Sequence, residues 1–316
     1  MAIHVSVIIA AHNAAAYVAS AVRSALDQTL RELEVILIDD AATDDTALVA
    51  LSAAKGDRRF SVLRCLSNGG PSAARNLGLD HAMGKWIAPL DADDTFSPNR
   101  LESMLQLAEA HDADLLADNI SVSRAPGFVA GSPALPHSFM TKAGRVSAAE
   151  FVARDRPGYG LKSVGFMKPL MRSDFLRSQQ IQYDPQLRNG EDFHLYMRCL
   201  LLGARLHVTP QAWYQYLYRS DSQTRGIEAR HPSQLIAANE NLEQIALECG
   251  DINALIELRK RRQDINRWIP YVSFVGALRE KQAYQAMRRF YSLPSHTYAL
   301  QRLLQAGLRR ACRTTS

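Results

Sequence analysis

The first 125 residues alternate between short apolar runs and segments with helical spacing, and this alternation limits the possible folds more than any other feature. The apolar runs stand at 5–11, 33–40, 60–65, 85–94 and 114–122, with helical patterns between them. Strands that are apolar on both faces and are separated by helices are typical of a parallel sheet covered on both sides. The pattern therefore predicts an α/β domain with a mostly parallel sheet.

The pattern changes twice in the rest of the chain. Residues 126–228 mix short strands with helices near 147–154, 173–179 and 191–202, whereas the chain from about residue 232 is helical only. We therefore expect one domain over 1–228, made of halves 1–125 and 126–228. A helical C-terminal region over 229–316 follows it.

Positive charge is concentrated at one end of the chain. The net charge is +5, but residues 257–316 alone carry thirteen Lys and Arg against three acids, which leaves −5 for residues 1–256. The acidic body, and a basic tail with no recognised nucleic-acid-binding motif, argue against a nucleic acid partner. The basic residues are interspersed along apolar helices. Such helices could lie on an anionic membrane surface, pack on the domain over 1–228, or join copies of the chain in a homo-oligomer.

The cysteines and the apolar runs bear on the cellular compartment. The four cysteines are scattered without metal-ligand spacing, which favours free thiols. The start of the chain lacks the features of a secretory leader, and no apolar run approaches the roughly 20 residues that span a bilayer. We expect a cytoplasmic protein, which the basic helices could hold at the inner face of the membrane.

Polar side chains follow three of the expected strands. Because the carboxyl ends of parallel strands meet at one edge of a sheet, these side chains should converge where ligands bind. They are Asn13, Asp39, Asp40, Asp91, Asp93 and Asp94. Clustered carboxylates of this kind favour Mg²⁺ or Mn²⁺, which usually also binds substrate phosphates. The alternative for the last three acids is a polar turn before the next helix.

Two further segments contain candidate binding or catalytic residues. In 68–78, Gly69 and Gly70 predict a tight turn with exposed N–H groups before a helix start, a site for anions, and Arg75 could reach a base or a phosphate. Neither a dinucleotide-binding nor a P-loop pattern is present. In 189–206, Glu191 and Asp192 begin an amphipathic helix, where they could be ordinary helix-start acids or include a general base.

Together these segments resemble family 2 glycosyltransferases, inverting enzymes of the GT-A fold that use nucleotide-sugar donors. The resemblance covers about residues 3–225. It rests on VSVIIAAHN, the Asp39–Asp40 pair, NGGPSAARNLGL, WIAPLDADD, and NGED before a helix. NGGPSAARN and LLADN (115–119) look most like bacterial exopolysaccharide enzymes of the succinoglycan type.

The resemblance implies a role for each candidate on the donor side. Residues that border or contact the nucleotide sugar would be Ala10, Ala11, Asn13, Asp39, Asp40, Asn68, Gly70, Arg75, Asp91 and Arg219. Among them, Asp40 would bind uracil with the support of Asp39, and Asp91 would approach the ribose or the donor sugar. Arg219, with Ser222 and Thr224, would close over the diphosphate.

The resemblance also implies which residues would bind the metal and which would act in catalysis. Asp93 and Asp94 would hold Mg²⁺ or Mn²⁺ on the diphosphate, and a late metal-ligand histidine is missing, since His231 lies too far along. Asp192 would be the catalytic base and Glu191 would bind or orient the acceptor. Lys168 is a further candidate, in a segment before the acceptor region.

The implied activity is hexosyl transfer from a UDP-hexose, such as UDP-glucose, to a hydroxyl group of a glycan or lipid-linked oligosaccharide in cell-surface polysaccharide synthesis. A glycosidase also uses paired carboxylates, but it would not need a metal cluster at a strand end. A sugar-nucleotide nucleotidyltransferase shares the α/β half, yet VSVIIAAHNAAAY lacks its Gly-rich basic signature. A non-catalytic nucleotide-sugar-binding or membrane scaffold protein is the third alternative.

Overall fold

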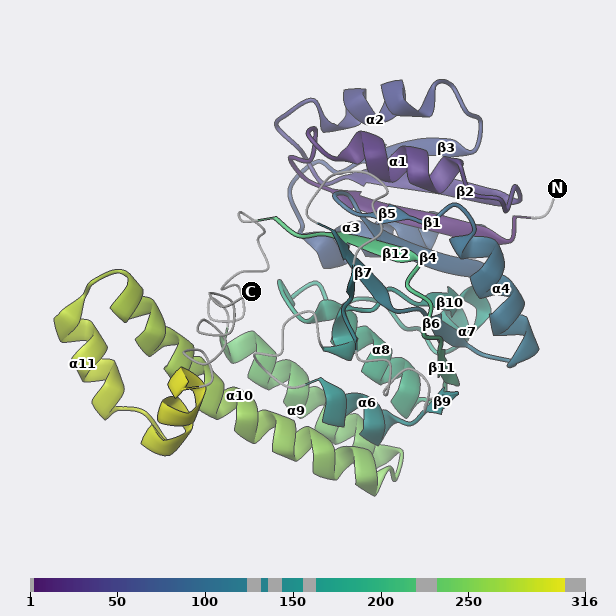
Figure 1. Ribbon diagram of the computed structural model, residues 1–316. Coiled ribbons are helices and arrows are strands. Elements are labelled where there is room, and N and C mark those ends of the chain that lie inside the picture. Colours follow the sequence, from purple (N-terminus) through teal and green to yellow (C-terminus); the bar gives the residue numbers. More distant parts are fainter. Residues whose placement is uncertain (1–2, 124–131, 136–143, 156–162, 220–231, 305–316) are drawn as a thin grey trace.

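The computed structural model describes residues 3–123, 132–135, 144–155, 163–219 and 232–304. Within them the main sheet has eight strands in the order β3-β2-β1-β4-β10-β6-β11-β9 (Figure 1). Its strands are β1 (Val5–Ala11), β2 (Leu33–Asp39), β3 (Phe60–Arg64), β4 (Trp86–Asp91), β6 (Leu115–Ala117), β9 (Arg145–Val146), β10 (Leu170–Arg172) and β11 (Leu206–Val208).

The four strands β3, β2, β1 and β4 run parallel, as the apolar runs predict. The register pairs Ala11 of β1 with Asp39 of β2, and Ala10 with Asp91 of β4. The three strands therefore end at the same edge. This edge collects the polar residues that follow each strand.

The other half of the sheet departs from the sequence pattern. β10 lies between β4 and β6 and is antiparallel to both. The single strand expected over 114–122 is wrong, because the chain divides into β6 and β7 (Ile120–Ser123), which belong to different sheets. The buried side chains of Asp118 and Asn119 accept backbone hydrogen bonds at the break, which ends the ladder there.

A second, smaller sheet forms beside the strand ends. Its order in the described residues is β5-β12-β7-β8, with β5 (Thr95–Phe96), β12 (Tyr214–Leu217) and β8 (Ser132–Pro133) joining β7. β12 is antiparallel to β5 and parallel to β7. This sheet brings a late segment of the chain against the turn that follows β4.

Helices cover both faces of the main sheet and bury two apolar clusters. One face carries α1 (Val18–Leu26), α2 (Thr46–Ala54) and α4 (Arg100–Ala110). The other carries α3 (Pro71–His81), α6 (Ala148–Arg154), α7 (Ser173–Ser178) and α8 (Glu191–Leu201), with a short 3₁₀ turn at Val164–Phe166. The alternation of strands and helices predicts this three-layer arrangement.

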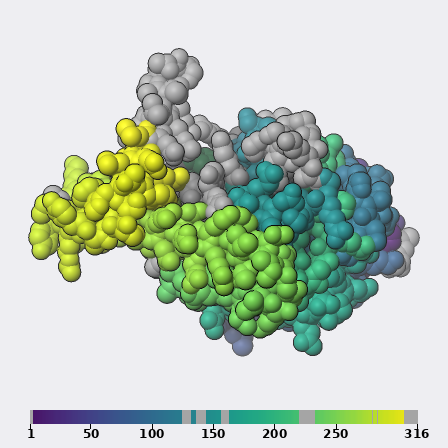
Figure 2. Space-filling view, turned by 90° about the horizontal axis from the view of Figure 1, so that it is seen from below, coloured from purple at the N-terminus to yellow at the C-terminus, as the bar shows by residue number. Residues whose placement is uncertain are grey.

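The C-terminal helices are α9 (Pro232–Glu248), α10 (Ile252–Arg279) and α11 (Ala283–Tyr291). α9 and the start of α10 bury Leu242, Ala246, Leu255 and Leu258 in the same cluster as α6 and α8. The C-terminal part of α10 and the whole of α11 extend away from the sheet (Figures 1 and 2). Among the described residues, no helix is long and apolar enough to cross a membrane.

Candidate active site

The ends of β1 and β2 are tied together by side chains. Asn13 adopts a positive φ of 51° and its Oδ1 accepts a hydrogen bond of 2.8 Å from the Thr43 N–H. Asp39 is buried, and its Oδ1 accepts a hydrogen bond from the Ala42 N–H. These bonds hold the loops that would border a nucleotide.

Asp40 organises the glycine-rich turn. Its two carboxylate oxygens accept hydrogen bonds of 2.8 Å each from the N–H groups of Gly69 and Gly70. The expectation that these N–H groups are exposed is therefore wrong, because Asp40 supplies the anion itself. Gly70 has a φ of 83°, and a Cβ there would lie 2.2 Å from a guanidinium nitrogen of Arg188. Asn68 donates to the carbonyl of Asp40.

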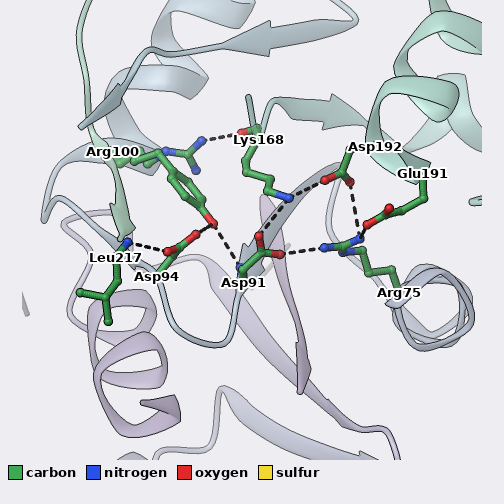
Figure 3. Close-up of polar contacts among 9 residues, drawn as sticks. Arg75, Asp91, Asp94, Arg100, Lys168, Glu191, Asp192 and Leu217 are labelled. Carbon is green, nitrogen blue, oxygen red and sulfur yellow. Dashed lines mark hydrogen bonds and ion pairs between the residues drawn. The ribbon is translucent and has the colours of Figure 1, made fainter. Parts of the chain in front are cut away.

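The three acids at the end of β4 and in the turn after it have different surroundings. Asp94 is buried, and its carboxylate accepts hydrogen bonds from the Tyr214 hydroxyl at 2.7 Å and the Leu217 N–H at 2.9 Å (Figure 3). The same hydroxyl accepts a hydrogen bond from the Asp91 N–H. Burial, together with the charges of Asp93 and Asp91, raises the pKa of Asp94 well above its ordinary value. Asp94 thus anchors the turn to β12.

Asp93 remains partly exposed beside a cation. Its carboxylate forms an ion pair of 2.8 Å with Arg219, whose guanidinium lies 4.4 Å from the centre of the Tyr17 ring. Burial and the neighbouring charge of Asp91 raise the pKa of Asp93. A carboxylate in that setting is stabilised by additional positive charge. Ser222, Thr224 and His231 lie outside the described residues.

The centre of the site is a network of five charged side chains from four parts of the chain (Figure 3). Arg75 of α3 contacts Asp91 at 2.7 Å, Glu191 at 2.8 Å and Asp192 at 3.5 Å. Lys168, which precedes β10, contacts Asp91 at 3.0 Å and Asp192 at 2.5 Å. The end of β4 and the start of α8 are therefore joined through two cations.

The network sets the ionisation of its members. Burial alone would lower the pKa of Lys168, but the carboxylates of Asp192 and Asp91 outweigh it and raise that pKa. Burial opposes the ionisation of Asp91 as well, but Lys168 and Arg75 hold the pKa of Asp91 well below its ordinary value. The two cations face three carboxylates, so the ionised network carries a net charge of about −1. Asp192 Oδ1 is buried and makes no hydrogen bond within the described residues.

The structure shows contacts that the sequence analysis did not anticipate. Arg75, expected at the base or phosphates, lies against Asp91 and the acids of α8. Behind the site, Arg100 and Asp118 form a fully buried ion pair of 2.8 Å. The sequence carries no signal for this pair, because Arg100 stands at the polar start of α4 and Asp118 stands beside another polar residue, Asn119.

Comparison with known proteins identifies the family. Residues 6–146 match the model of "Glycosyl transferase family 2". The chain is 35% identical over 236 residues to the succinoglycan biosynthesis protein ExoO of Rhizobium meliloti, covering 75% of this chain and 67% of that protein. It is 38% identical over 220 residues to ExoU of the same organism, covering 69% and 63%. The chain belongs to glycosyl transferase family 2.

Solved structures show the same fold. TarS 1–349 from S. aureus superimposes with a TM-score of 0.66 at 18% identity, over 92% of this chain and 91% of that one. The TarS complex with UDP-GlcNAc gives a TM-score of 0.61. The mannosyltransferase PcManGT of Pyrobaculum calidifontis, solved with GDP-Man and Mn²⁺, gives 0.59 at 18% identity, over 98% of this chain and 80% of that one.

The predictions of a GT-A fold and of a family 2 glycosyltransferase are therefore confirmed. The resemblance to enzymes of the succinoglycan type is confirmed as well. Family membership makes the chain a glycosyltransferase and disfavours the glycosidase, nucleotidyltransferase and scaffold alternatives. The domain division at residue 228 and the roles of single residues stay predictions.

Proposed function

We propose that the protein transfers a hexose, with inversion, from a UDP-sugar to a hydroxyl group of a glycan or lipid-linked oligosaccharide in exopolysaccharide synthesis. The observation that carries the proposal is the convergence of Arg75, Asp91, Lys168 and Asp192 at the edge where the parallel strands end. The UDP-GlcNAc complex of TarS and the role named for ExoO support the donor and the pathway class. We place the reaction in the cytoplasm, at the inner membrane face when the acceptor is lipid-linked.

The donor would lie over the ends of β1, β2 and β4. Asp39 and Asp40 order the loops beneath the base, and Asp40 also holds the glycine turn through which Asn68 and Gly70 would approach the nucleotide. Asp91 would contact the ribose or the sugar from the end of β4. Arg219 lies beside Asp93, where its charge would attract the diphosphate.

A divalent cation fits the acids of the turn after β4. No group of three or more metal-ligating side chains occurs in the described residues, so protein ligands alone would not complete a site. Mg²⁺ is commonly held by one or two carboxylates together with substrate phosphates. Burial and the charge of Asp91 raise the pKa of Asp93 despite its ion pair with Arg219, so a further cation would stabilise the ionised form. Asp93, with Asp94 behind it, would hold Mg²⁺ or Mn²⁺, which when bound offsets the charge gained by the departing diphosphate.

Asp192 is the proposed general base. It stands at the start of α8 with Oδ2 on Lys168, while Oδ1 has no hydrogen bond within the described residues. An acceptor hydroxyl at Oδ1 would lose its proton to Asp192 as it attacks the anomeric carbon. Lys168 and Arg75 orient the carboxylate, and Glu191 would orient the acceptor. The net negative network would also stabilise positive charge developing on the donor sugar.

The test is a screen of UDP-sugars for hydrolysis and for transfer to candidate acceptors with Mg²⁺ or Mn²⁺. We expect Asp192→Asn to lower kcat about 10³-fold, because the base is lost while its shape is kept. Asp93→Asn should weaken metal-dependent donor binding, and Asp174→Asn, at an exposed aspartate of α7, should match the parent. Transfer undiminished in Asp192→Asn, or a product with retained anomeric configuration, would contradict the proposal.

A further inference from the structure

α11 is apolar on two faces, and among the described residues one of them is packed while the other is exposed. Ala286 and Phe290 pack against the end of α10 in a small cluster of their own. On the outer side, Tyr284, Met287 and Tyr291 are exposed by 74%, 55% and 75%. Their spacing of three and four residues places them in one stripe along the helix. Apart from an edge contact between the rings of Tyr291 and Phe290 in the same helix, no aromatic contact or side-chain hydrogen bond is seen for this stripe among the described residues.

The helical segment 296–304 repeats the pattern. Ala299 is fully buried in the small cluster, whereas Leu300 and Leu304 are exposed by 54% and 67%. Singly exposed apolar side chains are normal on a protein surface, but a concentration of them marks an interaction site. We call residues 271–304 the C-terminal arm. Figures 1 and 2 show its α11 and final helical segment projecting from the body of the molecule.

The arm is also basic. It contains five Lys and Arg and one acid, Glu280, a balance of +4. Lys281 lies just before α11, and Arg288 stands beside the stripe between Met287 and Tyr291. Both are exposed, and neither forms an ion pair within the described part of the chain. Aromatic, Met and Leu side chains bordered by basic residues are the composition of helices that lie in the interface of an anionic bilayer.

We propose that the C-terminal arm is a membrane-docking element that seats the stripe of Tyr284, Met287 and Tyr291 among the headgroups of anionic lipids. The charge selects this occupant over a second copy of the chain, because two like arms would each bring +4 to a shared interface. Tyrosine is suited to the site, with an apolar ring and a hydroxyl that remains in the wet headgroup layer. The proposal deepens the membrane location given under the proposed function, and docking itself requires no turnover.

The experiment is flotation of the full chain with vesicles of phosphatidylglycerol and phosphatidylcholine, against vesicles of phosphatidylcholine alone. We expect recovery with the anionic vesicles at low salt and loss of most of it at about 0.5 M salt, because screening weakens the basic contacts. Tyr284→Ser/Met287→Ser/Tyr291→Ser should lower the partition coefficient about tenfold or more. Lys281→Gln/Arg288→Gln should lower it about tenfold and flatten its salt dependence.

Matched controls lie on α2 and just beyond it. Leu48 and Leu51 are exposed by 66% and 51%, so Leu48→Ser/Leu51→Ser removes similar apolar surface far from the arm. Lys55→Gln/Arg58→Gln removes the same charge there. The proposal fails if the arm and control variants float equally, or if the serine variants dissociate a dimer seen by light scattering without any change in flotation. UDP-sugar hydrolysis in the absence of vesicles reports separately on the proposed reaction.

Discussion

Arg100 and Asp118 connect two sides of the active site from behind. Both are 0% exposed, and Arg100 donates a 2.6 Å hydrogen bond to the carbonyl of Lys168. Asp118 accepts hydrogen bonds from the N–H groups of Trp213 and Tyr214. Lys168 and Tyr214 are the residues whose side chains hold Asp91 and Asp94. The buried pair therefore fixes the backbone at Lys168 and Tyr214, whose side chains contact Asp91 and Asp94, while Arg100 and Asp118 themselves form no hydrogen bond or ion pair with those two acids.

Breaking this pair should be costly. Asp118→Asn keeps an acceptor for the Tyr214 N–H but leaves the buried guanidinium of Arg100 without a counter-charge. We expect a loss of about 3–5 kcal/mol in the free energy of unfolding, measured by urea denaturation. Asp174→Asn, at an exposed ion pair of 3.8 Å, should change it by about 0.5 kcal/mol or less. A similar loss in the free energy of unfolding in both variants would show that the buried pair contributes no more than an exposed one.

At the scale of elements, α3 lies unusually close to the sheet. A Cβ at Gly78 would stand 2.5 Å from Cγ2 of Ile8 and 2.9 Å from Cδ1 of Ile38. The absence of a side chain lets the helix approach β1 and β2. That approach places Arg75, one turn earlier on α3, against the end of β4.

Gly78→Ala should therefore destabilise the fold by about 1–3 kcal/mol through overpacking. Gly276 offers a matched control, because it also lies inside a helix but a Cβ added there would meet no neighbouring atom within 4 Å. Gly276→Ala should be neutral or stabilising by up to about 1 kcal/mol, through helix propensity. Thermal unfolding followed by circular dichroism distinguishes the two. Equal melting temperatures would contradict the close approach.

The contact between α8 and α9 should be sensitive to pH. His194 is buried, its Nε2 lies 3.2 Å from Oδ1 of Asn241, and burial lowers its pKa. Below the ordinary histidine pKa of about 6.5, the unfolded chain then binds more protons than the folded one, so the free energy of unfolding falls with falling pH. In His194→Gln this fall between about pH 7.5 and 5.5 should be shallower, as urea denaturation at each pH would measure. Parallel pH profiles would contradict the assignment.

At the scale of the whole molecule, the C-terminal region divides into two parts with different surroundings. Arg261, one of the basic residues of the tail, is buried in an ion pair of 2.8 Å with Asp155 and lies 3.8 Å from the centre of the Phe193 ring. Leu242 and Leu258 belong to the apolar cluster that α6 and α8 also line. Arg261 is thus part of the core, whereas five other basic residues belong to the C-terminal arm.

Two truncations test this division. A chain ending after Pro270 keeps the contacts of α9 and the start of α10, and we expect its melting temperature to stay within about 5 °C of the full chain. A chain ending at residue 231 exposes the apolar faces of α6 and α8 and leaves Asp155 without Arg261. It should yield little soluble protein or lose its cooperative transition. Equal melting temperatures for both truncations would show that α9 contributes nothing to the core.

Local pattern was sufficient for the elements that are long and periodic. The four parallel strands, the helices between them, and the meeting of Asn13, Asp40 and Asp91 at one edge all follow from apolar runs and the geometry of parallel strands. β10 could not be predicted, because a three-residue strand carries too little pattern to separate it from a loop. The division between β6 and β7 depends on which distant backbone groups Asp118 and Asn119 meet.

The amino-acid order thus determines the layer architecture, the family and the set of acids at the strand ends, since these depend on local periodicity and on residue types at short spacing. Folding alone decides that Arg75 and Lys168 join Asp91 to Asp192, that Asp94 is an anchor to β12, and that Arg261 is core while Arg288 is surface. Each of these outcomes is a contact between segments distant in the chain. The strengths of these ion pairs and hydrogen bonds depend on burial and on neighbouring charges, which are set only once the segments have packed.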